Sequence, residues 1–147
     1  MNLCLRYTKN EADAMEVLNT GFYKVYKHIE KFDNRKASVY TWIRTIIINS
    51  CLDHIKSRQA APGTRVLEQA VDSALPPASI KGLSATEILE FVRQLPPASQ
   101  AVFNLYVTDG FNHKEIAHLM GIKEGTSKWH LSEARKILQK LIKDHND

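Results

Sequence analysis

The sequence predicts an all-α chain: two small helical domains joined by a flexible linker, with a helix-turn-helix in the C-terminal domain. Apolar residues recur at intervals of three and four on both sides of the middle segment, as they do on one face of a helix. No two alternating runs are joined by an Asn-Gly type turn, so a β-hairpin is not indicated. The middle segment, residues 59–83, holds three of the five prolines and carries no net charge, as expected of a linker.

Length and composition exclude several classes of protein. With 147 residues, 44% of them hydrophobic and 24% charged, the chain has the composition of a globular protein with its own core. Its longest apolar run, Ile46–Ile48, is far too short for membrane insertion, and no signal-peptide pattern opens the sequence. Cys4 and Cys51 lack metal-ligand spacing. We therefore expect a cytoplasmic protein with reduced thiols, in which Cys51 is packed rather than reactive.

The first domain, residues 1–58, is predicted to contain two helices separated by a polar, turn-prone segment at 30–36. Thr20-Gly21 interrupts the first helix with a poor helix former. The expected inner stripe of that helix is Ala12, Val17, Leu18, Phe22, Val25, Tyr26 and Ile29. The second helix spans residues 38–57, and its expected inner face is Val39, Trp42, Ile43, Ile46, Ile47 and Ile55.

The second domain, residues 84–147, has clear helix boundaries. Ser84-x-x-Glu87 has the spacing of a capping box and opens a helix that runs to Leu95. Pro96 ends that helix, and Pro97 fits the first turn of the next one, which stops at Asp109-Gly110. The residues expected to point inward from this second helix are Ala101, Val102, Leu105 and Tyr106.

Two further helices complete the predicted helix-turn-helix. Asn112-x-x-Glu115 resembles another capping box and opens a short helix, for which Gly121 is a suitable C-terminal cap. The last helix runs from about Glu124 to Lys143. Its expected inner stripe is Leu131, Ala134, Leu138 and Leu141.

Positive charge is concentrated on this last helix. Residues 123–143 hold six basic and two acidic side chains, whereas residues 84–122 hold two basic and four acidic ones. In a helix-turn-helix the second helix of the motif enters the major groove, where cations meet phosphates. The net charge of +4 permits a nucleic-acid partner without demanding one. The pattern predicts that this helix binds duplex DNA. The alternative is that its basic face is only exposed to solvent.

Other chemistry finds no support in the sequence. His113 and His118 are five residues apart, one more than the spacing that places two metal ligands on one helix face. No nucleophile-elbow, P-loop, zinc-protease or dinucleotide-binding motif occurs. We therefore predict no enzyme, no catalytic residue, no metal and no cofactor.

A set of turn, core and helix-entry residues in the second domain carries a family resemblance. It runs through Leu95-Pro96-Pro97-Ala98-Ser99-Gln100, Asp109-Gly110-Phe111-Asn112-His113-Lys114-Glu115-Ile116-Ala117 and Glu124-Gly125-Thr126-Ser127-Lys128. Together these segments resemble region four of bacterial RNA polymerase sigma factors. The resemblance implies that the domain reads the minus-thirty-five promoter element. The DNA contacts expected on its recognition helix are Lys123, Thr126, Ser127, Lys128, His130 and Arg135.

The first domain resembles region two of the same family. Tyr40-Thr41-Trp42-Ile43-Arg44 and Leu52-Asp53 look like its second half, and Leu5-Arg6-Tyr7-Thr8 looks like part of its first half. The region usually starts with a further helical turn or more, so we expect an N-terminally shortened version. Two such domains without anything of region-three size resemble the extracytoplasmic-function (ECF) group, in which an inhibitory anti-sigma protein is the usual partner.

Region two in this family binds a coiled coil of the polymerase clamp and captures a flipped base of the melted minus-ten element. The resemblance places polymerase contacts at Asp13, Glu16, Asn19 and Phe22. It places minus-ten contacts at Tyr40, Trp42, Arg44, Asn49, Lys56 and Arg58. Trp42 also lies on the apolar stripe, so core packing remains open for it. Asp53 is expected to form an ion pair or a cap.

The resemblance thus implies a transcription initiation factor that directs core RNA polymerase to promoters. Its partners would be promoter DNA, core polymerase and an anti-sigma protein. Departures from the family pattern, such as Met15 and Asn19 on a helix that is usually more acidic, keep an alternative open. That alternative is a DNA-binding transcription regulator that does not engage polymerase. A third hypothesis is a protein-interaction module that binds no DNA.

Overall fold

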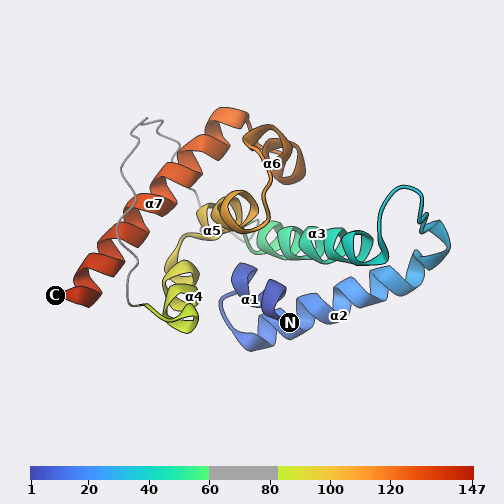
Figure 1. Ribbon diagram of the computed structural model, residues 1–147, viewed down its shortest axis with the longest axis horizontal. Coiled ribbons are helices and arrows are strands. Elements are labelled where there is room, and N and C mark those ends of the chain that lie inside the picture. The colour runs from blue at the N-terminus through green and yellow to red at the C-terminus, as the bar shows by residue number, and fades with distance from the viewer. Residues whose placement is uncertain (60–82) are drawn as a thin grey trace. The chain divides into compact units, whose positions relative to one another are not determined.

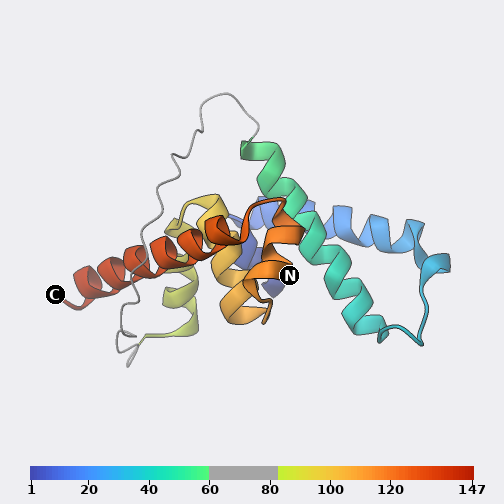
Figure 2. The same ribbon diagram turned by 90° about the horizontal axis from the view of Figure 1, so that it is seen from above.

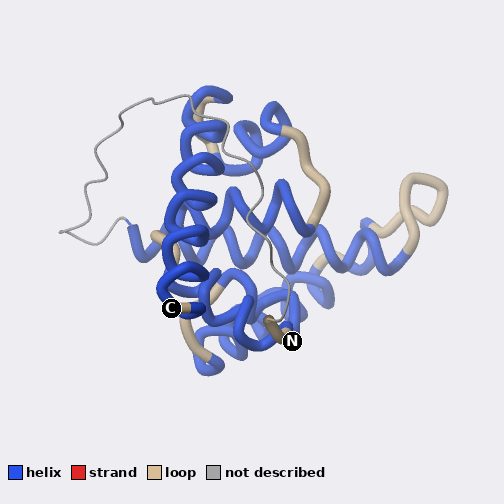
Figure 3. The backbone as a smooth tube through the Cα atoms, turned by 60° about the vertical axis from the view of Figure 1, so that its left-hand side comes forward, coloured by secondary structure: helices blue, strands red, loops and turns tan. Residues whose placement is uncertain are grey.

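The computed structural model describes residues 1–59 and 83–147, and every regular element in these two ranges is a helix (Figure 1, Figure 3). The described residues form two compact units. We call residues 1–59 the N-terminal unit and residues 83–147 the C-terminal unit. The all-α fold is confirmed. The predicted linker, residues 59–83, lies almost entirely outside the described residues.

The N-terminal unit is built around two long helices, α2 (Glu11–Lys27) and α3 (Val39–Gln59), which form its most extensive contact and cross obliquely (Figure 2). The short helix α1 (Asn2–Tyr7) packs on both. A 3₁₀ turn, η1 (Ile29–Lys31), follows α2. The Oδ1 atom of Asn10 accepts a hydrogen bond of 2.8 Å from the backbone N–H of Asp13, so Asn10 caps α2 and fixes where it begins.

The core of this unit lies where α2 and α3 cross. Its buried side chains come from all three helices, and those with the least exposure are Cys4, Ala14, Val17, Ile48, Cys51 and Leu52. Gly21 is buried at the crossing, and a Cβ atom there would overlap Cδ1 of Ile47. Thr20-Gly21 therefore does not interrupt α2. The glycine lets the two helices approach closely, which outweighs its low helix propensity.

Part of the predicted inner stripe of α2 is wrong. Phe22, Tyr26 and Ile29 are 50%, 79% and 55% exposed, although their spacing suggested core positions. Within the described residues, the most extensive contacts of α2 are with α3 and α1, and Val17 and Val25 lie on the buried face. The remaining apolar face of α2 is therefore exposed in the described part of the N-terminal unit.

The C-terminal unit begins with α4 (Ala85–Gln94) and α5 (Pro97–Phe103) and ends with α6 (His113–Met120) and α7 (Glu124–Asn146). Both predicted capping boxes are present, at the starts of α4 and α6, and proline opens α5 as expected. Gly121 ends α6 with a left-handed φ of 67°, a conformation that side chains other than glycine disfavour. The boundaries predicted from local sequence are confirmed.

A π-helical segment, η2 (Asn104–Thr108), continues α5 and changes which side chains point inward. The wider turn keeps Leu105 fully buried but leaves Tyr106 38% exposed, so the prediction of an inward Tyr106 is wrong. α7 packs on α4, α5 and α6 and closes the core. One core cluster joins Val92, Leu95 and Ala134, with Phe103, Ile137 and Leu138 packed against it.

No helix in residues 1–59 or 83–147 combines the length and apolar character that crossing a bilayer requires.

Candidate nucleic-acid and polymerase interfaces

The start of α7 is held in place by two hydrogen bonds between serine and histidine. Nδ1 of His113, on α6, lies 2.9 Å from Oγ of Ser127, and Oγ of Ser99, on α5, lies 3.0 Å from Nδ1 of His130. The two bonds sit one turn apart on the inner side of α7. They fix the rotation of this helix about its axis relative to α5 and α6, and so determine which of its residues face outward.

Two predicted DNA contacts are therefore inside the unit. Ser127 is fully buried and His130 is 7% exposed, so neither side chain reaches a duplex without moving. We withdraw both from the candidate DNA-binding residues. A signal for this was present in the sequence, because Ser127 precedes Leu131 by four residues and Ala134 by seven, and so lies on the same inner stripe.

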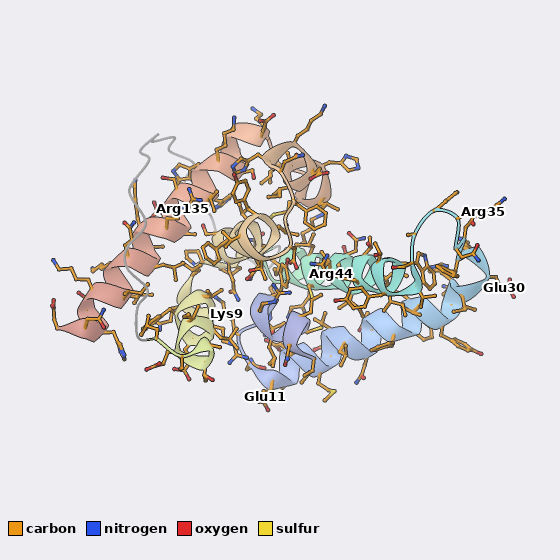
Figure 4. All side chains as sticks on the ribbon, in the orientation of Figure 1. Lys9, Glu11, Glu30, Arg35, Arg44 and Arg135 are labelled. Atoms are coloured by element: carbon orange, nitrogen blue, oxygen red, sulfur yellow. The ribbon has the colours of Figure 1, made fainter. Side chains whose placement is uncertain are left out.

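The remaining candidates on α7 keep their place near or on its surface. Lys123 and Arg135 are exposed, and Thr126 is half-buried (Figure 4 labels Arg135). Lys128 is exposed and forms an i,i+4 ion pair of 3.2 Å with Glu124. Lys128 and Arg135 are seven residues apart and so share one side of the helix. The outward side of α7 thus offers separated cations at the spacing of two helical turns.

The surroundings of His113 lower its pKa and so favour the neutral imidazole. Burial lowers the pKa of His113, the nearby charges of Lys128 and Arg135 lower it further, and Glu124 acts in the opposite direction. The ring also stacks on Tyr106 with 4.6 Å between centroids. A neutral His113 can share the hydrogen bond with Ser127 without adding a charge behind α7.

In the N-terminal unit, α3 carries the candidate minus-ten residues on several sides. Tyr40 is 74% exposed, and Asn49 and Lys56 are exposed two turns apart on one side. Arg44 is half-buried (Figure 4). Trp42 is half-buried and packs on Phe32, with ring centroids 5.3 Å apart and planes tilted by 52°. This contact gives Trp42 the packing role that its position on the apolar stripe left open.

Two predicted contact residues are paired with each other instead. Nη1 of Arg58 lies 2.6 Å from Oδ2 of Asp13, and Nε2 of His54 lies 3.9 Å from the same oxygen. Nδ2 of Asn10 donates to that oxygen as well. Through these contacts Asp13 joins the start of α2 to the end of α3. Because its side chain is only 13% exposed, Asp13 is a poor candidate for a polymerase contact.

Arg58 keeps an exposed side chain, but its charge is balanced by Asp13, which weakens the case for a phosphate contact. Asp53 forms an ion pair of 3.0 Å with Lys24, as expected for a structural role. The sequence offered no direct signal for the Asp13–Arg58 pair, because the two residues are 45 positions apart.

The uncovered side of α2 forms a continuous surface. Met15, Asn19, Phe22 and Tyr26 of α2 succeed one another at intervals of four and three residues, Ile29 of η1 follows three residues later, and all five are exposed. This is the spacing of a helix that packs against another helix as in a coiled coil. We call these five residues the α2 outer face. Glu16 is exposed beside it.

In the described ranges, no group of three or more histidine, cysteine, aspartate or glutamate side chains is arranged to hold a metal ion. The candidate sites are instead three helical surfaces. Those on α3 and α7 carry polar and positively charged side chains, and the one on α2 is largely apolar.

Comparison with known proteins identifies the family. Residues 1–61 match the family model described as Sigma-70 region 2, and residues 85–138 match the one described as Sigma-70, region 4. The ECF RNA polymerase sigma factor SigW of Bacillus subtilis is 28% identical, over 97% of this chain and 82% of that protein. The chain belongs to the ECF group of the sigma-70 family.

Further similarities agree with this assignment. The ECF sigma factor SigM of Bacillus subtilis is 26% identical, over 93% of this chain and 84% of that protein. A solved structure of the sigma factor RpoE in complex with the anti-sigma factor NepR, from Bartonella quintana, has 22% sequence identity and a TM-score of 0.62. It covers 95% of this chain and 87% of that one, and it supports the fold.

Proposed function

We propose that this chain directs core RNA polymerase to promoters and that each of its three surfaces binds a different part of the complex. The α2 outer face binds the polymerase clamp, α3 binds the minus-ten element, and the outward side of α7 binds the minus-thirty-five element. The protein acts in the cytoplasm by binding, and catalyses no reaction of its own.

The observation that carries the proposal is the α2 outer face. Large apolar side chains that are exposed together on one face of a helix mark a surface for a partner. Their four-three spacing suits a partner that is itself helical, as the clamp coiled coil of this family is. Phe22 and Tyr26, as central aromatic residues, are the expected centres of binding energy. Glu16 and Asn19 supply polar contacts beside them.

On α3, exposure and chemistry support a single-strand contact. Tyr40 offers an exposed ring on which a base can stack, and Asn49 offers an amide that can donate to and accept from a base edge. Lys56 and Arg44 supply positive charge for the backbone phosphates. Flipping a base out of a duplex costs a few kcal/mol, and stacking together with edge hydrogen bonds offsets that cost.

On α7, Lys128 and Arg135 are the central duplex contacts, with Lys123 and Thr126 at the start of the helix. The backbone N–H groups at this start receive no side-chain cap, so they can also face a phosphate. Lys128 exchanges Glu124 for a phosphate when it binds. Because each neutralised phosphate releases counterions, binding through these residues weakens as salt rises.

The division into residues 1–58, 59–83 and 84–147 is part of the proposal. The middle segment joins the two DNA-binding units covalently, so binding by one raises the effective concentration of the other at the promoter. An anti-sigma protein is the proposed inhibitor. Its expected binding surface is the α2 outer face, because covering that face blocks the proposed contact with polymerase. The solved complex of RpoE with NepR motivates this partner.

The test is transcription in vitro with purified core polymerase on a pool of promoter fragments. Transcripts that depend on the chain and share two upstream elements are expected. In the variant Phe22→Ala/Tyr26→Ala, co-purification with core polymerase and transcription are expected to be lost while duplex binding is kept. Ile88→Ala, which truncates an exposed apolar residue of α4, is the matched control.

Duplex binding by the parent chain without any association with core polymerase would refute the proposal. That result would favour the regulator with a helix-turn-helix.

A further inference from the structure

The two cysteines of the chain meet in the core of the N-terminal unit. Cys4 lies on α1 and Cys51 on α3, and they are 0% and 1% exposed. The thiols are joined by a side-chain hydrogen bond, so each sulfur is the other's neighbour. The contact brings together residues 47 positions apart, through the packing of α1 on α3.

We propose that Cys4 and Cys51 form an oxidisable dithiol site, at which a peroxide-class oxidant converts the two thiols into a disulfide that ties α1 to α3. None of the residues proposed to contact polymerase or DNA takes part, so this site is independent of the proposed function. Two thiols in hydrogen-bond contact form a disulfide when the sulfurs approach to about 2 Å.

The reaction balances with hydrogen peroxide as the only co-reactant. The Cys4 thiolate attacks one peroxide oxygen, the O–O bond breaks, and the departing hydroxide leaves as water with the proton that Cys4 gave up. Cys4 is now a sulfenic acid. The sulfur of Cys51 attacks the sulfur of Cys4, the S–S bond forms and the S–O bond breaks. The second hydroxide takes the Cys51 proton and leaves as water, so two thiols have lost two electrons and two protons.

The chemical environment favours Cys4 as the attacking thiol. The hydrogen bond with Cys51 lowers the pKa of Cys4 to about 7, although burial acts in the opposite direction. A thiol with this pKa is partly ionised at neutral pH, and the thiolate is the form that reacts with peroxide. A second thiol in contact resolves the sulfenic acid before it can be oxidised further.

Access to the buried pair comes from α1. This helix has six residues, too few for stability on its own, and within it only Cys4 and Tyr7 are buried. Local opening of α1 exposes both sulfurs without unfolding the contact between α2 and α3. Closure of the disulfide then holds α1 in place. It closes a loop of 48 residues, which is expected to raise the Tm of the N-terminal unit by about 10–20 °C.

The experiment treats the reduced, full-length chain with hydrogen peroxide under native conditions, alkylates the remaining thiols and identifies the peptides by mass spectrometry. The expected result is loss of both free thiols, a mass decrease of two hydrogens and a peptide that links Cys4 to Cys51. The chain stays monomeric on a non-reducing gel, and dithiothreitol reverses the change. These readouts use the parent chain and do not depend on whether a variant folds.

Variants sharpen the test. Cys51→Ser keeps a hydroxyl that can donate a hydrogen bond to Cys4 but cannot form a disulfide, so it is expected to stop at a sulfenic acid on Cys4 that a dimedone probe captures, whereas the parent gives no such adduct. Disulfides between chains, sulfinic acid on either cysteine without a Cys4–Cys51 peptide, or two unreacted thiols under conditions that oxidise the urea-unfolded chain would each overturn the proposal.

Discussion

Removal of the Ser99 hydroxyl tests whether burial determines the strength of the bonds that hold α7. Oγ of Ser99 lies 3.0 Å from Nδ1 of His130, and both residues are buried. In Ser99→Ala the imidazole loses this partner in a place that water does not reach, which costs about 1–3 kcal/mol. Ser127→Ala removes the equivalent bond to His113, which is half-buried and can bind water instead, so the cost is about 0.5–1 kcal/mol.

The two variants are compared by urea unfolding. Each unit contains one tryptophan, so in a Trp42→Phe background the fluorescence of Trp129 reports on the C-terminal unit alone. Trp129 is well placed, because its ring contacts that of His130 with centroids 4.9 Å apart. The free energy of unfolding should fall about twice as much in Ser99→Ala as in Ser127→Ala. An equal or reversed order, or a change below about 0.3 kcal/mol in both, would refute the reasoning.

The remaining predictions use single substitutions. Since the folded pKa of His113 is below its ordinary value of 6.5, the C-terminal unit should lose stability as pH falls below 6.5, and His113→Gln should reduce that slope in urea titrations at several pH values. Gly21→Val should destabilise the N-terminal unit by about 1–3 kcal/mol, because the new side chain must displace the end of the buried Ile47 side chain; an unchanged unfolding midpoint would contradict this. Lys128→Ala should weaken duplex binding and reduce its salt slope by about one, as read from affinities at several salt concentrations. Asn49→Ala should leave duplex binding unchanged but slow promoter opening, so equal opening rates would remove it from the candidate residues.

Local signals in the sequence predicted the helix boundaries of the C-terminal unit well, whereas the short helix α1 was not predicted. Ser84 with Glu87, the proline that opens α5, and Gly121 each act through backbone groups within a few positions, so their effect can be predicted without knowing the tertiary fold. The π-helical turn at 104–108 lay beyond such rules. Within it Leu105 is buried and Tyr106 is 38% exposed, a pattern that the 3.6-residue period of an α-helix does not predict.

Contacts between distant residues explain the other differences. Periodicity identified an apolar stripe on α2, but it could not say that α1 and α3 cover only one side of that helix. Phe22 and Tyr26 therefore moved from the predicted core to a candidate interface. Similarly, family resemblance placed Asp13 and Arg58 in two separate binding roles, whereas the fold brings them together in an ion pair.

The dual position of α7 has an evolutionary consequence. This one helix of 23 residues carries the candidate minus-thirty-five contacts on its outer side and closes the core cluster of Val92, Leu95 and Ala134 on its inner side. A change at an inner position shifts every outer residue at once. New promoter preferences can therefore arise most readily at outward positions such as Lys123, Lys128 and Arg135, where substitution leaves the core intact. Descendants of such a protein can diversify their target sequences while inheriting one unchanged scaffold.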